Sequence, residues 1–142
     1  EFVSQPLPVD MLCKQLDKLG KKFQWVHNSS CGIHVHVSRK WLSARKAIAI
    51  YNWIKTLTNA EFELLFGREP NYYCRTEGTI GSTRYLAVNT ENKATIEFRM
   101  FSSGSADWAK YCVKMVEYLV CNAYHLNLDA ALAFKDLYFK TF

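Results

Sequence analysis

Two short segments of the sequence carry side chains whose types and spacing could do chemistry. The first, residues 31–39, reads Cys-Gly-Ile-His-Val-His-Val-Ser-Arg, so that apolar and polar residues alternate. Successive strand side chains face opposite sides of a sheet, and the pattern therefore predicts a strand with His34 and His36 on its polar face. Imidazole is a common metal ligand, and two rings at this spacing can reach one small volume.

The second segment, residues 94–101, reads Ala-Thr-Ile-Glu-Phe-Arg-Met-Phe and has the same design. Apolar residues occupy its even-numbered positions 96, 98 and 100, and Glu97 and Arg99 lie on the other face. If both strands bury their apolar faces on one side of a common sheet, these two residues share the opposite face with His34 and His36. Carboxylates bind hard cations and arginine binds phosphate, so the pattern predicts a site that handles metal and phosphate.

Each pattern also has a plainer interpretation. Two histidines on a strand are often solvated, and a Glu-x-Arg pair at a surface contributes little to stability. Cys31 with His34 as its base is a weak candidate for nucleophilic catalysis, because residues three apart on a strand face opposite sides. Walker, dinucleotide-binding and Gly-x-Ser-x-Gly motifs are absent from the sequence.

Composition is typical of one folded domain, which we place at residues 1–142. The chain has 142 residues, is 49% hydrophobic and carries a formal net charge of +5. The positive charge suits phosphates, but no continuous basic stripe or base-stacking motif is present, so nucleic-acid binding is the least favoured function. The longest apolar runs are short, and we expect neither membrane insertion nor secretion, but a cytoplasmic protein.

Hydrophobic periodicity and capping residues predict an α+β fold, an antiparallel sheet with helices packed on one face. Gly20 is expected to end the first helix, and Ser43 to cap the second. The segment that follows Gly67, up to about residue 83, contains Tyr72, Tyr73 and Arg75 and is a candidate substrate or lid loop. The remaining elements are a strand at the opening Glu1–Ser4, strands over 23–27 and 84–89, and helices over about 44–58, 60–66, 106–123 and 129–142.

Four motifs in this order resemble the amidoligase family, which is found in bacterial and phage genomes. They are the opening Glu-Phe-Val-Ser-Gln-Pro-Leu, Cys-Gly-Ile-His-Val-His-Val at 31–37, Arg-Tyr-Leu-Ala-Val-Asn at 84–89 and Thr-Ile-Glu-Phe-Arg-Met-Phe at 95–101. The resemblance covers residues 1 to about 104, and the Gly-x-His-x-His with the later Glu-Phe-Arg is its most specific part. Members are ATP-dependent carboxylate–amine ligases with a glutamine-synthetase-like fold.

The resemblance implies ATP and two divalent cations, Mg²⁺ or Mn²⁺, as cofactors. Glu1 would hold one cation, and His34 with Glu97 would hold the other against the nucleotide phosphates. His36 would contact phosphate or help to position an acyl-phosphate intermediate.

The resemblance also assigns roles to the positively charged residues. Arg84 and Arg99 would neutralise the transferred γ-phosphate and the carboxylate under activation, and Asn89 would be a supporting hydrogen-bonding residue of the nucleotide site. The implied substrates are a small-molecule or peptide carboxylate and an amine, joined as an amide. Positioned cations suit this chemistry, because phosphoryl transfer needs electrostatic stabilisation more than a protein nucleophile.

One feature of the family is missing from this sequence. Family members have an earlier strand with a Glu-x-Glu type segment that supplies further metal carboxylates. We therefore expect a fragment of a longer chain, completed by an upstream segment or by another copy in a homo-oligomer. The alternative is a degenerate ligase fold that serves as a structural or binding module, such as a phage virion or assembly component.

Overall fold

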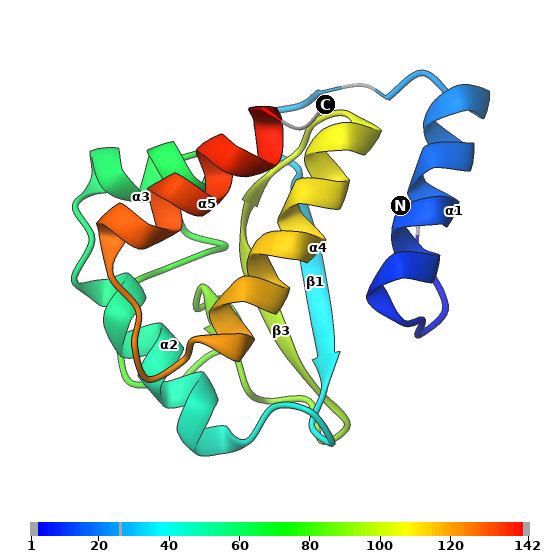
Figure 1. Cartoon of the computed structure of the whole chain (residues 1–142). Coiled ribbons are helices and arrows are strands. Elements are labelled where there is room, and N and C mark those ends of the chain that lie inside the picture. Colours follow the sequence, from blue (N-terminus) through cyan, green and yellow to red (C-terminus); the bar gives the residue numbers. More distant parts are fainter. Residues whose placement is uncertain (1–2, 26, 141–142) are drawn as a thin grey trace.

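The computed structural model describes residues 3–25 and 27–140, and Glu1, the predicted ligand of one cation, lies outside them. The fold is α+β, as the sequence predicts. In the described residues the sheet has three antiparallel strands, β1 (Gly32–Ser38), β2 (Val88–Asn89) and β3 (Thr95–Ser102), in the order β1-β3-β2 (Figure 1). The central strand β3 therefore carries residues that face both of its neighbours.

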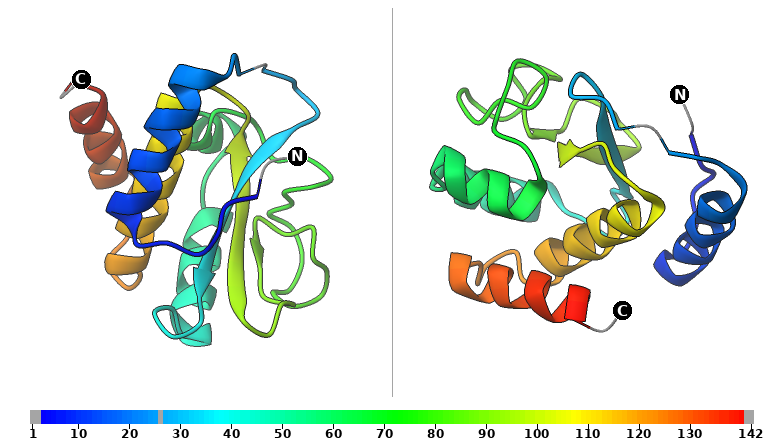
Figure 2. Two further views of the ribbon diagram at one scale, coloured as in Figure 1. Left: turned by 90° about the vertical axis from the view of Figure 1, so that its right-hand side faces the viewer. Right: turned by 90° about the horizontal axis from the view of Figure 1, so that it is seen from above.

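Over the part of the chain that the structure describes, five helices accompany the sheet: α1 (Val9–Lys22), α2 (Ala44–Lys55), α3 (Asn59–Phe66), α4 (Ala106–Cys121) and α5 (Leu128–Lys140). Helix α4 packs against one face of the sheet, with α1 beside it, and the loop that follows α3 lies on the opposite side (Figure 2). None of the helices in the described part of the chain is long and apolar enough to cross a membrane.

The core lies between β3 and the helices on that face. Ile96, Phe98 and Met100 are fully buried, as the alternating pattern predicts, and Val35 of β1 is also buried. Their partners on the helices include Phe66 and further fully buried residues, namely Ile50, Ile54, Phe62, Leu65, Met115 and Leu119. One face of the sheet is therefore apolar, and the polar side chains lie on the other.

The first helix does not end at Gly20 but continues to Lys22, and Phe23 is its C-cap. Gly20 has a packing role instead, because a Cβ atom at this position would lie 2.6 Å from Cβ of Ala106 at the start of α4. The absence of a side chain allows the two helices to approach closely. The prediction was wrong because a glycine at a helix–helix contact looks like a C-terminal glycine in the sequence.

Helix N-termini follow their capping residues. Ser43 caps α2, with its hydroxyl accepting a hydrogen bond from the amide of Lys46, and Ser105 caps α4 in the same way. The third helix begins at Asn59, one residue earlier than expected, because Thr58 is its cap. Thr58 and Glu61 exchange hydrogen bonds between side chain and backbone in a capping box.

Three strand predictions need correction. Residues 23–25 and 27 form no strand, and neither do residues 3 and 4 of the opening segment. Only Val88–Asn89 of the predicted strand over 84–89 pairs with β3. Ahead of it the chain pairs with Arg75, whose backbone amide donates to the carbonyl of Tyr85 and whose carbonyl accepts from Ala87. The loop after α3 thus takes the hydrogen bonds that a longer strand would use.

Candidate functional site

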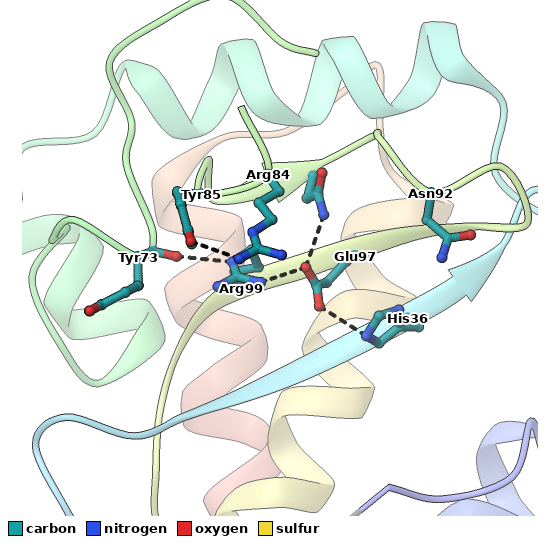
Figure 3. A pocket seen from close by; sticks show the side chains of 8 residues that line it. His36, Tyr73, Arg84, Tyr85, Asn92, Glu97 and Arg99 are labelled. Carbon is teal, nitrogen blue, oxygen red and sulfur yellow. Dashed lines mark hydrogen bonds and ion pairs between the residues drawn. The ribbon is translucent and has the colours of Figure 1, made fainter. Parts of the chain in front are cut away.

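Glu97, at the centre of β3, is the residue around which the polar face of the sheet is arranged (Figure 3). It lies directly opposite His36 of β1, and its side chain is only 9% exposed. Its Oε2 atom lies 3.0 Å from Nε2 of His36 and 3.4 Å from Nδ1 of His34. The two histidines thus reach one carboxylate oxygen, as the alternation of β1 predicts.

The other oxygen of Glu97 contacts two further nitrogen donors. Nη1 of Arg99 donates to Oε1 at 2.8 Å, and Nδ2 of Asn89 on β2 donates to the same oxygen at 3.1 Å. Burial by itself raises the pKa of Glu97, but the hydrogen bonds from its four neighbours outweigh burial. They hold that pKa well below the ordinary value of 4.5. Glu97 is therefore a carboxylate at neutral pH, in contact with nitrogen atoms of four side chains.

The pairing of β1 with β3 contains a β-bulge next to this cluster. Ile33 pairs with Phe101 and Val35 with Phe98, so that the single residue His34 faces Arg99 and Met100 together. The bulge also turns Phe101 into the core, although the sequence pattern places residue 101 on the polar face. Strand alternation alone does not predict this bulge.

Arg68, just after α3, holds the bulge in place. Its guanidinium donates to the carbonyls of Arg99 at 2.6 Å, Met100 at 3.3 Å and Cys31 at 3.5 Å. A bulge leaves backbone carbonyls without a partner on the neighbouring strand, and the N–H groups of the Arg68 guanidinium supply the missing hydrogen bonds. Gly32 makes room for this contact, because a Cβ atom there would lie 2.7 Å from Nη2 of Arg68.

The loop after α3 packs onto the site and orients Arg99. The Nε atom of Arg99 donates to the backbone carbonyl of Tyr73 at 3.0 Å, while Nη1 is paired with Glu97. The guanidinium also lies 5.7 Å from the ring centroid of Tyr85. Contacts on three sides fix one orientation for Arg99, whose side chain is 11% exposed.

Arg84 lies at the rim and is exposed. Its Nη2 atom donates to the hydroxyl of Tyr85 at 2.9 Å, and its guanidinium lies 5.0 Å from that ring. Among the described residues, Arg84 has no ion pair with an acidic side chain. Its charge is available to an anion that enters the site.

These residues surround a cavity of about 460 Å³ on the polar side of the sheet (Figure 3). Of the predicted site residues, the cavity lining includes His36, Arg84, Asn89, Glu97 and Arg99, and His34 reaches it through its contact with Glu97. Three further lining residues were not predicted as site residues: Tyr73, Tyr85 and Asn92. One sequence feature could have identified the two tyrosines: Tyr73 follows Tyr72, and Tyr85 follows Arg84, in segments without regular structure.

Within residues 3–25 and 27–140, no group of three or more His, Cys, Asp or Glu side chains forms a ready-made metal centre. The distances from Oε2 of Glu97 to the two histidine nitrogens are compatible with part of the coordination shell of a divalent cation. Two ligands at about 2.1 Å from an octahedral ion lie about 3.0 Å apart when they are adjacent. His36 and Glu97 have this separation, and the His34 contact is 3.4 Å. A cation here would take the place of these hydrogen bonds and would need oxygen ligands from phosphate or water.

No protein-family model matches the chain, and neither a curated protein nor a solved structure matches it. The resemblance to amidoligases therefore stays a prediction from four sequence motifs.

Proposed function

We propose that this chain is an ATP- and Mg²⁺-dependent carboxylate–amine ligase of the amidoligase type, with a glutamine-synthetase-like catalytic fold. The observation that supports the proposal is the gathering of Glu97, two histidines and two arginines around one cavity of about 460 Å³. These are the residues on which the motif resemblance depends. A buried carboxylate beside arginine suits chemistry in which phosphate charge must be neutralised.

The proposed reaction has two steps. A carboxylate oxygen of the substrate attacks the γ-phosphorus of ATP, the bond from that phosphorus to the bridging oxygen breaks, and ADP leaves with the electron pair. The amine nitrogen then attacks the acyl carbon, the bond from carbon to the phosphate oxygen breaks, and inorganic phosphate leaves. The amine loses its proton to water as the amide forms.

The residues of the site have distinct roles in this proposal. Arg99, fixed by Glu97 and by the carbonyl of Tyr73, would present one oriented guanidinium to the transferred phosphoryl group. Arg84 would bind the substrate carboxylate from the rim. His36 would contact phosphate, with its Nδ1 atom 3.3 Å from the hydroxyl of Thr95. A divalent cation, Mg²⁺ or Mn²⁺, would be held by His34 and Glu97 and would neutralise phosphate charge.

Calorimetry with Mg·ATP tests the nucleotide site. We expect metal-dependent binding at micromolar concentrations by the folded chain, lost in His34→Gln and Glu97→Gln. His125→Gln is the matched control, since His125 is an exposed histidine outside the cavity, and this variant should bind like the parent. Absence of binding by the correctly folded parent would contradict a self-sufficient ligase. Addition of an upstream segment would then test whether the site is incomplete.

A second assay addresses the chemistry directly. Hydroxylamine can replace the amine, because it attacks acyl phosphates to give hydroxamates that are detected as coloured iron complexes. We expect hydroxamate to form from a carboxylate pool only when ATP and Mg²⁺ are both present. Arg99→Gln should abolish product while leaving the fold intact.

The second candidate function is a structural or binding module with a ligase-like fold, such as a virion or assembly component. One observation favours it, since all four nitrogen donors around Glu97 already come from the chain itself. Such a carboxylate could serve only to fix the sheet. The Mg·ATP titration separates the two, because a module of this kind has no need to bind the nucleotide.

A further inference from the structure

A cluster of three tyrosines stands on the arginine side of the cavity. The rings of Tyr72, Tyr73 and Tyr85 contact one another in a triangle, with centroid separations of 5.2, 5.3 and 5.7 Å. Tyr72 and Tyr73 are 59% and 54% exposed, although both are large aromatic side chains. Exposed aromatic surface gathered at the edge of a polar cavity is typical of a ligand-binding surface.

Positive charge surrounds these rings. The guanidinium groups of Arg75, Arg84 and Arg99 all lie within 6 Å of the Tyr85 ring, at 5.9, 5.0 and 5.7 Å, and Arg75 also covers one face of Tyr72 at 4.0 Å. Glu97 is the acidic residue that lines the cavity, and its oxygens are taken by nitrogen donors of the chain. The field therefore disfavours a cationic ligand on the tyrosines and favours an anionic one.

The arrangement also limits how far the anion can be from the rings. Arg84 donates to the hydroxyl of Tyr85, and Arg99 is held by the carbonyl of Tyr73. An anion on either guanidinium group therefore has the tyrosine rings as its immediate neighbours. The organic group on the rings must then be attached to that anion by only a few bonds. A nucleobase does not meet this condition, because a ribose and two further phosphates separate it from the transferred phosphoryl group.

We propose that the tyrosine cluster Tyr72, Tyr73 and Tyr85 binds an aromatic group of the acid substrate, so that the substrate is an arylcarboxylate or an aromatic amino acid. That the bound acid is a substrate rests on the proposed function. That the site binds an anion with an aromatic group rests on the residues of the cavity alone. The carboxylate lies on Arg84, which donates to the hydroxyl of Tyr85, and the aryl ring packs against the exposed face of Tyr73.

Titration of the folded chain with three acids, without nucleotide, tests the ligand class. Phenylacetate, cyclohexylacetate and acetate have the same charge and differ in ring type or in the presence of a ring. We expect phenylacetate to bind about tenfold more tightly than acetate and about threefold to fivefold more tightly than cyclohexylacetate, because aromatic pairs gain energy beyond their buried area. Equal affinity for phenylacetate and cyclohexylacetate would overturn the proposal.

Variants locate the effect. Tyr73→Leu should remove the preference for phenylacetate, and its exposed side chain makes loss of folding a small risk, to be checked by circular dichroism. Tyr124→Leu is the matched control, because Tyr124 is also 54% exposed and lies outside the cavity. Arg84→Gln should weaken binding of all three acids equally. A preference for phenylacetate that survives in Tyr73→Leu would overturn the assignment to this cluster.

Parallel titration with Mg·ATP distinguishes failure of this inference from failure of the proposed function. Binding of Mg·ATP without a preference among the acids overturns the aromatic substrate and leaves the ligase. A preference for phenylacetate without binding of Mg·ATP overturns the ligase and supports the aryl-anion site.

Discussion

His36 lies directly opposite Glu97 across the pair of strands β1 and β3, and its Nε2 atom is 3.0 Å from Oε2 of that carboxylate. Direct opposition in an antiparallel ladder brings side chains of one face within contact distance. The rest of the cluster around Glu97 extends from this pair, through His34 along β1 and Arg99 along β3.

The pH dependence of stability should report the state of Glu97. The folded-state pKa of Glu97 is lowered, so the stability that its carboxylate contributes is present above about pH 4.5 and is lost as the pH falls toward the folded-state value. As the pH falls below about 4.5, the free energy of unfolding of the parent should decrease by up to about 1.4 kcal/mol per pH unit more than that of Glu97→Gln. Urea denaturation between about pH 3 and about pH 7 measures this difference.

The same variant should be less stable at neutral pH, by about 1.5–3 kcal/mol, because hydrogen bonds to a charged group are lost. Glu63→Gln is the control, since Glu63 is exposed on α3 and should follow the parent at every pH. Parallel curves for the parent and Glu97→Gln would contradict the lowered pKa.

Replacement of Arg68 should weaken the bulge at Arg99 and Met100. Arg68→Met leaves the carbonyls of Arg99 and Met100 without their donor, and we expect a loss of about 2–3 kcal/mol in the free energy of unfolding. Arg68→Lys should recover only part of it, because an ammonium group cannot reproduce the planar fork. Chemical denaturation measures the loss, and Arg45→Met, at an exposed arginine of α2, should leave stability within about 0.5 kcal/mol.

A substitution at Gly20 tests the close approach of α1 and α4. Gly20→Ala should gain up to about 1 kcal/mol from helix propensity if nothing opposes it. The Cβ contact of 2.6 Å with Ala106 opposes it, and we expect a net loss of about 1–2 kcal/mol in thermal or chemical unfolding. Combination with Ala106→Gly should reverse much of the loss by removing the opposing Cβ. A Gly20→Ala chain that is more stable than the parent would show that the helices are not held so close.

Removal of the Tyr85 hydroxyl should loosen Arg84. Tyr85→Phe keeps the ring near the three arginines but deletes the acceptor that lies 2.9 Å from Nη2 of Arg84. We expect affinity for inorganic phosphate or acetate to fall by about twofold to fivefold, the effect of one modest hydrogen bond. Calorimetry measures it, and Tyr124→Phe, at a tyrosine remote from the cavity, should show no change. Unchanged affinity in Tyr85→Phe would mean that the hydroxyl does not orient Arg84.

The sequence by itself was enough to predict β1 and β3 and the four polar residues they share. Alternation has a period of two whatever the tertiary context, so His34, His36 and Glu97 could be placed on one face before the structure was known. The same local physics predicted the cap at Ser43, because an N-cap acts within a single turn.

Only the tertiary structure decided the features that depend on contacts between distant segments. The bulge opposite His34, the Arg68 fork that satisfies it and the packing role of Gly20 each join elements far apart in the chain. The tyrosine cluster is of the same kind, since Tyr73 reaches Arg99 across 26 positions. Local propensity carries no information about such pairings, because their energy exists only once the sheet and the helices have come together.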